Sequence, residues 1–157
     1  MKNLVKSNAK KFLIAVLVLL FSVVSFSLFS LKGVNAEENV AKIGETEYAT
    51  LQDAVNAINN GEAESDTITL IANAEVDNIA VTADTYLVLN GYTVQAVAKT
   101  AFKVLNDATL YIDGTEEGSE VHGTLIAGYS GNNNGNIVID GGTYTATIAD
   151  EPAVQNN

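Results

Sequence analysis

Two hydrophobic periodicities follow each other along this chain, the first typical of a helix and the second of short strands. Apolar residues recur at the spacing of one helix face, at Leu51, Ala54, Val55 and Ile58. A helix is therefore predicted over about 51–60, with Thr50 as its N-terminal cap and Asp53 completing a weak capping box. Gly61 supplies the stop, because glycine readily takes the left-handed conformation that ends many helices.

After Ser65 the period changes to two, and four segments of similar pattern follow at 68–72, 87–91, 110–114 and 137–141. Their fourth positions are spaced by 19, 23 and 27 residues, which indicates stacked repeats rather than a conventional globule. Alternate side chains of a strand share a face. One face is therefore expected to carry Ile68, Leu70, Leu87, Leu89, Leu110, Ile112, Ile137 and Ile139. The opposite face is expected to carry Thr69, Val88, Tyr111 and Val138.

Shorter strands are predicted between these segments, at 79–82, 93–96, 102–105 and 124–127. Each repeat then holds two or three strands separated by turns, which is about one coil of a solenoid. An antiparallel sandwich is the competing interpretation, with the Asn-Gly and Asp-Gly pairs as hairpin turns. Equivalent segments recur at about the length of a full coil and not at hairpin spacing. The pattern therefore favours an all-β solenoid, a parallel β-helix with one short N-terminal capping helix.

Part of this pattern resembles the N-terminal cap and first coils of the pectin lyase-like right-handed parallel β-helix superfamily. The resembling residues are Ile43-Gly44, the run from Tyr48-Ala49-Thr50-Leu51 to Ala54-Val55, and Asp66-Thr67-Ile68, with Ser65 where that superfamily usually has glycine. The segments 108–114 and 135–144 are similar to coils of large bacterial surface proteins of this type. The resemblance covers about two-thirds of the chain. It implies a right-handed β-helix but very little about activity.

The start of the chain has the order of features that is typical of a secretion signal. Lysines without any acid precede an apolar run over 12–31, and Val34-Asn35-Ala36 offers small or β-branched residues for cleavage. We expect a signal peptide over 1–36 and a β-helix domain over 37–157, with its cap at about 40–61 and its coils at about 66–157. No second helix or polar terminal repeat closes the last coil, so the domain is expected to be incomplete at its C-terminus. An uncleaved membrane anchor is the alternative, because 20 residues can cross a bilayer as a helix.

The expected mature chain is strongly acidic. Five of the eight lysines leave with the signal and all nineteen acids stay, so its net charge is −16, and its cations are Lys42, Lys99 and Lys103. Nucleic acid and anionic membrane surfaces are excluded as partners of the mature domain, because binding them requires many positive charges. The chain contains no arginine and no cysteine, and the absence of cysteine excludes disulfides and thiolate metal sites.

Two aspartates are candidates for glycoside hydrolysis, which needs two carboxyl groups at a defined separation. Asp113 and Asp140 occupy equivalent positions of neighbouring coils. Each also precedes a glycine and aligns with Asn90, so the interpretation as simple turn residues is favoured. Neither motif contains a basic residue, whereas the enzymes of the resembling superfamily typically place one near the scissile sugar.

Other polar side chains offer weaker candidate sites. His122 is the sole histidine and is expected in a coil turn. Tyr86 and Tyr111 could stack on sugars and are expected on outward positions of neighbouring coils, one residue out of register. An acidic run has the oxygen ligands that suit calcium, but no spacing of a defined calcium loop, so a solvated surface is favoured. Its members are Asp107, Asp113, Glu116, Glu117 and Glu120.

These patterns predict a non-catalytic β-helix module of a secreted or cell-surface protein, working in adhesion or as a stalk. No residue is assigned to catalysis, to a cofactor or to a metal. The alternative is a truncated or degenerate carbohydrate-active domain of the pectin lyase-like type, which a basic residue facing an acidic pair would favour. The expected partners are a carbohydrate or another surface protein, together with self-association through the open C-terminal coil.

Overall fold

The computed structural model describes residues 38–128, 134–146 and 153–156, and the predicted signal peptide lies outside them. This described part is mainly β, with twelve strands and the helix α2 (Leu51–Asn59). Within it, no helix has the length and apolar character needed to cross a membrane.

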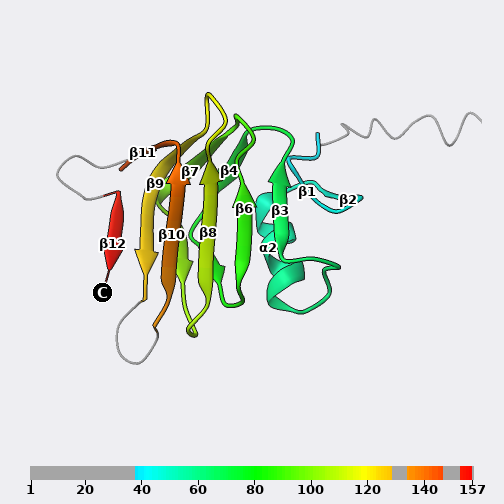
Figure 1. Ribbon diagram of the computed structural model, residues 1–157, viewed down its shortest axis with the longest axis horizontal. Helices are drawn as coiled ribbons and strands as arrows, with labels where there is room; N and C mark the ends of the chain where they lie inside the picture. The colour runs from blue at the N-terminus through cyan, green and yellow to red at the C-terminus, as the bar shows by residue number, and fades with distance from the viewer. Residues whose placement is uncertain (1–37, 129–133, 147–152, 157) are drawn as a thin grey trace, which may run out of the picture. The chain divides into compact units, whose positions relative to one another are not determined.

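The first sheet has six strands in the order β10, β8, β6, β3, β1 and β2 (Figure 1). The bounds are Ala41–Ile43 (β1), Thr46–Tyr48 (β2), Thr67–Leu70 (β3), Thr85–Val88 (β6), Thr109–Gly114 (β8) and Asn136–Gly141 (β10). Strands β3, β6, β8 and β10 pair in parallel, whereas β1 pairs antiparallel with β2 and with β3. This parallel pairing rules out the antiparallel sandwich, because hairpin turns join antiparallel strands.

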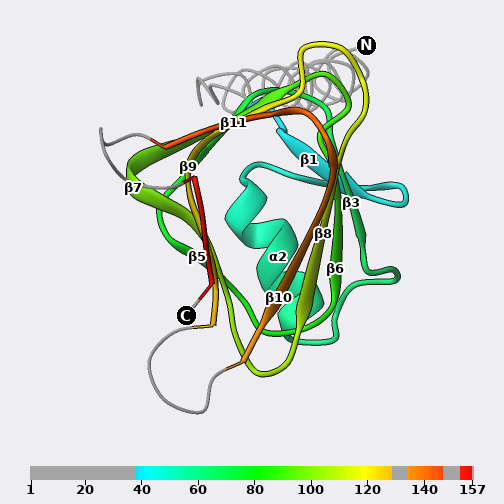
Figure 2. The same cartoon turned by 60° about the vertical axis from the view of Figure 1, so that its left-hand side comes forward.

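After each strand of the first sheet from β3 onward, the chain crosses to the second sheet. Its bounds are Ala74–Val76 (β4), Ile79–Val81 (β5), Thr93–Val104 (β7), Glu120–Ala127 (β9), Thr143–Thr145 (β11) and Val154–Asn156 (β12). Strands β4 and β5 pair with the two halves of β7, and β11 and β12 with the two halves of β9, all in parallel. Four repeats follow, each with one strand in the first sheet and one or two in the second, around a common interior (Figure 2).

Helix α2 forms where the apolar pattern predicted it and covers the end of the core at the first repeat. The Thr50 hydroxyl accepts a hydrogen bond from the backbone N–H of Asp53 at 3.1 Å, which confirms the cap. The predicted apolar stripe is buried, and the helix packs against β1, β2, β4 and β5. At its last residue, Asn59 donates to the carbonyl of Ala80 and accepts from the N–H of Thr82. The helix therefore covers the apolar end of the stack and is tied to β5 by a side chain.

The inner face of the first sheet carries the predicted aliphatic side chains. Six of the eight are at most 1% exposed: Ile68, Leu70, Leu87, Leu89, Leu110 and Ile112. The other two lie on β10, where Ile137 is half-buried and Ile139 is 37% exposed. In the described part of the chain, the first sheet has no strand beyond β10 to cover them. The prediction of an inner face is therefore correct, and the core thins at its last repeat.

The register between β6 and β8 differs by two residues from the predicted alignment. Leu87 pairs with Ile112, and Leu110 lies opposite Thr85. Equivalent residues are therefore 68, 87, 112 and 139, spaced by 19, 25 and 27. A shift of two residues keeps every side chain on its own face, so the hydrophobic pattern cannot detect it. The alignment of Asn90 with Asp113 and Asp140 was wrong for this reason.

Strand β7 joins two segments that were predicted as separate strands, 93–96 and 102–105. Its pairing with β9 shifts between Gln95 and Thr100 and again before Phe102, which marks a β-bulge. Val97 protrudes there and is 68% exposed. Gly123 faces the bulge, and a Cβ at this position would lie 2.6 Å from that of Ala96. The bulge thus explains both the break in the pattern and the glycine beside it.

Side chains replace missing backbone partners at the corners between the sheets. The backbone N–H of Thr93 donates a hydrogen bond to the side chain of Asn73, and that of Thr109 donates one to the side chain of Asp84. Asn90, with a left-handed φ of 52°, donates its side-chain amide to the carbonyl of Leu70. Buried backbone groups require such partners. Short polar side chains at the corners therefore tie each repeat to its neighbour.

We expect Leu110→Asp to lower the free energy of unfolding by about 3–5 kcal/mol, because it buries a carboxylate among aliphatic neighbours. The matched control is Val138→Asp, on the outer face and 47% exposed, which should cost less than about 1 kcal/mol. Urea unfolding of both variants measures the difference. Equal losses would show that the inner and outer faces are assigned wrongly.

Candidate functional site

The outer face of the first sheet carries two rows of side chains that cross its strands. The register places Thr67, Tyr86, Tyr111 and Val138 in one line, which we call the tyrosine row. Two residues further along the same strands lie Thr69, Val88, Asp113 and Asp140, the carboxylate row. Residues two apart in a strand share a face, so both rows point outward.

A groove of about 310 Å³ lies between the two rows and is lined by members of both. Leu87 and Ile112 also line it, but their side chains are buried in the core, so they contribute backbone to its floor. The groove reaches from Thr67 on β3 to Asp140 on β10. It therefore crosses four strands, which corresponds to about 14 Å at the usual spacing between strands.

Tyr86 and Tyr111 stack face to face, with ring centroids 4.3 Å apart and planes inclined by 4°. Each ring covers one face of the other. The next position of the row is Val138, so no ring of the row covers the second face of Tyr111. A second hollow, lined among others by Tyr111, Asn136 and Val138, meets the groove at this step. The side chain that follows Tyr111 in the row is therefore the shorter Val138, which is 47% exposed.

This tyrosine pair is in register, and the predicted offset of one residue was wrong. Aligning Leu87 with Leu110 in fact places Tyr86 opposite Thr109, two residues from Tyr111, and the two-residue shift between β6 and β8 brings the tyrosines into register. Aligning Tyr86 with Tyr111 keeps the aliphatic residues on the inner face equally well. Matching the aromatic residues was therefore the signal in the sequence that would have found the stack.

The hydroxyl of Tyr86 stays protonated at neutral pH. The pKa of Tyr86 is raised, first by desolvation and then by the charge and hydrogen bond of Tyr111, with smaller contributions from the carboxylates of Asp66 and Asp84. Tyr86 is 43% exposed, so its hydroxyl is open to a ligand. The stack therefore offers the neutral hydroxyl of Tyr86 together with aromatic surface.

Asp113 is held as an anion at the edge of the groove. Its Oδ1 accepts from the hydroxyl of Thr115 at 2.7 Å and from the N–H of Thr115 at 3.0 Å. These two hydrogen bonds lower the pKa of Asp113. Asp140 is its direct neighbour on β10, and both side chains are exposed. The predicted pairing of Asp113 with Asp140 is thus confirmed. Asp113 lies on a strand and not in a turn, and its carboxyl group loses its proton readily.

The field of this carboxylate pair reaches Tyr144 on β11. The Tyr144 ring packs partly against the core, and within the described part of the chain its hydroxyl is buried without a hydrogen-bond partner. Burial raises the pKa of Tyr144 to about 12, with further contributions from the charges of Asp113 and Asp140. The negative charges of the two aspartates therefore act on Tyr144 as well as on the groove.

Lys42 is the basic residue that extends the carboxylate row. It lies on β1 opposite Thr69, and opposite Glu47 of β2 on its other side. Three strand spacings, about 14 Å, separate it from Asp113 along the row. Lys42 therefore does not face the aspartate pair closely enough to act on the same chemical group.

The acidic run is divided among different elements. Asp107 lies in a turn, Asp113 on β8, Glu116 and Glu117 in the next turn, and Glu120 on β9. Among the residues that the structure describes, no three His, Cys, Asp or Glu side chains are grouped so that they could hold a metal ion.

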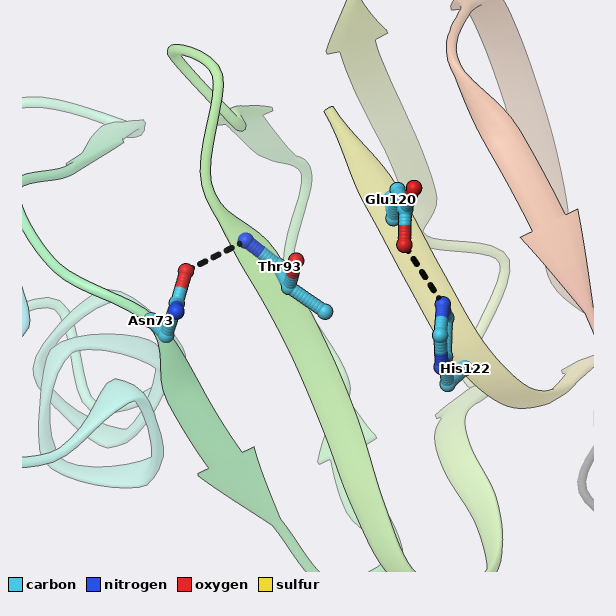
Figure 3. Close-up of polar contacts among 4 residues, drawn as sticks. All are labelled: Asn73, Thr93, Glu120 and His122. Atoms are coloured by element: carbon cyan, nitrogen blue, oxygen red, sulfur yellow. Dashed lines mark hydrogen bonds and ion pairs between the residues drawn. The ribbon is translucent and has the colours of Figure 1, made fainter. Parts of the chain in front are cut away.

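The outer face of the second sheet is polar and carries the histidine. His122 lies on strand β9, not in a turn as predicted, and its Nε2 is 2.8 Å from Oε2 of Glu120 (Figure 3). On the neighbouring strands, Asn73 accepts a hydrogen bond from the N–H of Thr93 at 2.9 Å (Figure 3). These contacts join neighbours within the sheet, so this face is described by local pairing rather than by a ligand groove.

We expect Tyr144→Phe to change how stability depends on alkaline pH. The raised pKa of Tyr144 means that the folded state holds this proton more tightly than the unfolded chain, whose value is near 10. The resulting stability is present below pH 10 and is lost as the pH rises towards 12. The phenylalanine variant should be at least as stable at pH 7, because no hydrogen bond is removed, and should lose less stability between pH 10 and 12. Thermal unfolding of both proteins across this range measures the difference, and parallel curves would contradict the expectation.

Comparison with known proteins assigns this chain to no family. No protein-family model, no curated protein and no solved structure matches it. The resemblance to the pectin lyase-like superfamily is therefore a prediction from the residues quoted above, and the argument for function must come from the site.

Proposed function

We propose that the four repeats are the first coils of a right-handed parallel β-helix. Three features support this interpretation: the chain alternates between two sheets, every pairing beyond β3 is parallel, and equivalent positions recur once per passage. Crossover connections between parallel strands of one sheet are right-handed in almost all proteins, which gives the handedness. Helix α2 takes the place of the N-terminal cap that a solenoid requires.

We propose that this β-helix is a non-catalytic adhesion module of a secreted or cell-surface protein and that it binds carbohydrate in the groove between the two rows. The observation that carries the proposal is the stacked pair of Tyr86 and Tyr111 next to the exposed Val138, beside two carboxylates. Aromatic faces bind the apolar faces of sugar rings, while carboxylates accept hydrogen bonds from hydroxyls. A stack on a β-sheet is also rigid, so little order must be gained on binding.

Binding is favoured over glycoside cleavage by the lowered pKa of Asp113. Neighbouring strands bring Asp113 and Asp140 to a separation similar to the roughly 5 Å of retaining enzymes. Such enzymes also need one carboxylic acid with a raised pKa, kept protonated by burial. The pKa of Asp113 is lowered instead, by its bonds to Thr115. The alternative of a truncated or degenerate carbohydrate-active domain therefore lacks support for its acid.

We propose in addition that the last repeat self-associates. Val138, Ile139 and Val154 are exposed there, at 47%, 37% and 42%. An uncovered strand also offers unpaired backbone groups to another chain. The acidic charge of the protein opposes association, so its extent should rise as salt screens the charge. Light scattering across a salt series tests this, with Ile139→Lys, which puts a charge on the edge, expected to reduce it; a monomer at every salt concentration would overturn the proposal.

Two substitutions in the tyrosine row test carbohydrate binding. Tyr111→Ala removes the open face and should weaken binding at least about tenfold, whereas Tyr111→Phe keeps the ring and should bind nearly as well. Val138→Tyr adds a third ring to the stack in the place that we assign to the sugar, and should abolish binding while leaving the fold stable. The measurement is calorimetry or a glycan array with the exported protein, whose mass should correspond to Glu37 as its first residue.

Controls for this experiment separate binding from folding and from catalysis. Val97→Ala, at an exposed position of the second sheet, should bind like the unmodified protein. Binding that survives Val138→Tyr would contradict the site. Incubation with the same glycans is expected to release no new reducing ends, and a steady release that Asp113→Ala abolishes would support the carbohydrate-active alternative.

A further inference from the structure

We propose that the sugar bound over Val138 carries a protonated amine, so that the ligand is a cationic glycan of the glucosamine type. This inference rests on the proposed carbohydrate-binding function and names the class of its ligand. It follows from the place of the Tyr111 ring and of the exposed Val138 beside it, relative to the carboxylates of Asp113 and Asp140.

The ring face and both carboxylates converge on one position of the sheet. A sugar ring that continues the stack would lie over Val138 on β10. Asp140 is two residues along the same strand and points to the same side, about 7 Å away at the usual rise. Asp113 is the neighbour of Asp140 on β8. A substituent of the sugar that points along the strand therefore meets two carboxylates at once.

A cation would stabilise these two carboxylates more than a neutral hydroxyl group would. Like charges directly opposite each other on neighbouring strands are destabilising. Asp113 keeps its charge because Thr115 donates two hydrogen bonds to it. Lys42 lies three strands away in the same row and is opposite Glu47. An ammonium group between Asp113 and Asp140 would remove their repulsion and make charge-assisted hydrogen bonds to both.

The surroundings of the groove favour a cation as well. Asp66 and Asp84 act on Tyr86, and Asp113 and Asp140 lie two residues along their strands from Tyr111 and Val138, so carboxylates lie near both ends of the tyrosine row. The face of an aromatic ring also attracts cations. An anionic glycan such as a polyuronate would be repelled by the same charges, and by a chain with a formal net charge of −11.

A glycan fits this surface better than a basic peptide does. Extended peptides gain affinity by adding a strand to a sheet edge, where backbone groups are free. The groove lies on the face of the sheet, and the strands β3, β6 and β8 beneath it are paired on both sides. In the described part of the first sheet, a peptide would find free backbone groups along the edge of β10, beside this face, and not on the face itself, whereas a sugar needs only the ring face and the carboxylates.

The test compares three short oligosaccharides of equal length with the exported protein: glucosamine, N-acetylglucosamine and galacturonate oligomers. We expect the glucosamine oligomer to bind at least about tenfold more tightly than its acetylated form, and to weaken as salt is added. Asp140→Asn should remove most of this preference. Glu75→Gln is the matched control, because it removes the same charge from the outer face of the second sheet. The galacturonate oligomer should not bind.

The outcomes separate this inference from the function on which it rests. Equal binding of the amine and acetylated forms, insensitive to salt but lost in Val138→Tyr, would overturn the inference and support the carbohydrate site. Binding of none of the three oligomers would overturn both. Oligolysine that binds as tightly as the glucosamine oligomer, and that no longer binds to the Val138→Tyr variant, would overturn the choice of a glycan. A preference for the amine that survives Asp140→Asn would show that the two aspartates are not its source.

Discussion

The in-register stacking of Ile68, Leu87, Ile112 and Ile139 is the interaction on which the rest of this structure depends. A single repeat is too thin to bury its own apolar face, so each repeat is stabilised by its neighbours. The side chains that lie on the N-terminal side of the stack are fully buried, because α2 covers them. Burial declines at β10, where Ile139 has a neighbour on one side within the described chain.

The same register determines the outer surface of the first sheet. Once Leu87 is aligned with Ile112, Tyr86 must meet Tyr111, and Val88 must meet Asp113. The candidate site is therefore a consequence of core packing on the opposite side of the strands. Hydrogen bonds between strands hold both rows on a rigid support, which suits recognition of a ligand that itself has little flexibility.

Charge distinguishes this surface from a catalytic one. Catalysis by paired carboxyl groups requires environments that push their pKa values apart. Here Asp113 is exposed and bonded to Thr115, which stabilises its anion, and the largest rise in pKa among the neighbouring groups falls on the half-buried Tyr144. The arrangement keeps a negative surface next to a neutral aromatic stack. The proposed recognition of a positively charged ligand rests on this charge complementarity, which would also repel acidic ligands.

The sequence by itself determined which residues are inside, because the twofold alternation of Ile68, Leu70, Leu110 and Ile112 and the helical stripe of α2 are local properties. It also determined the helix cap at Thr50. It did not determine the register, since a shift of two residues leaves the same side chains buried. Only the tertiary structure decided that Leu87 is aligned with Ile112, that His122 lies on a strand, and that two predicted strands join across a bulge at Val97. It thereby decided that Tyr86 stacks on Tyr111 beside Asp113, because contacts across strands depend on a pairing that no local pattern specifies.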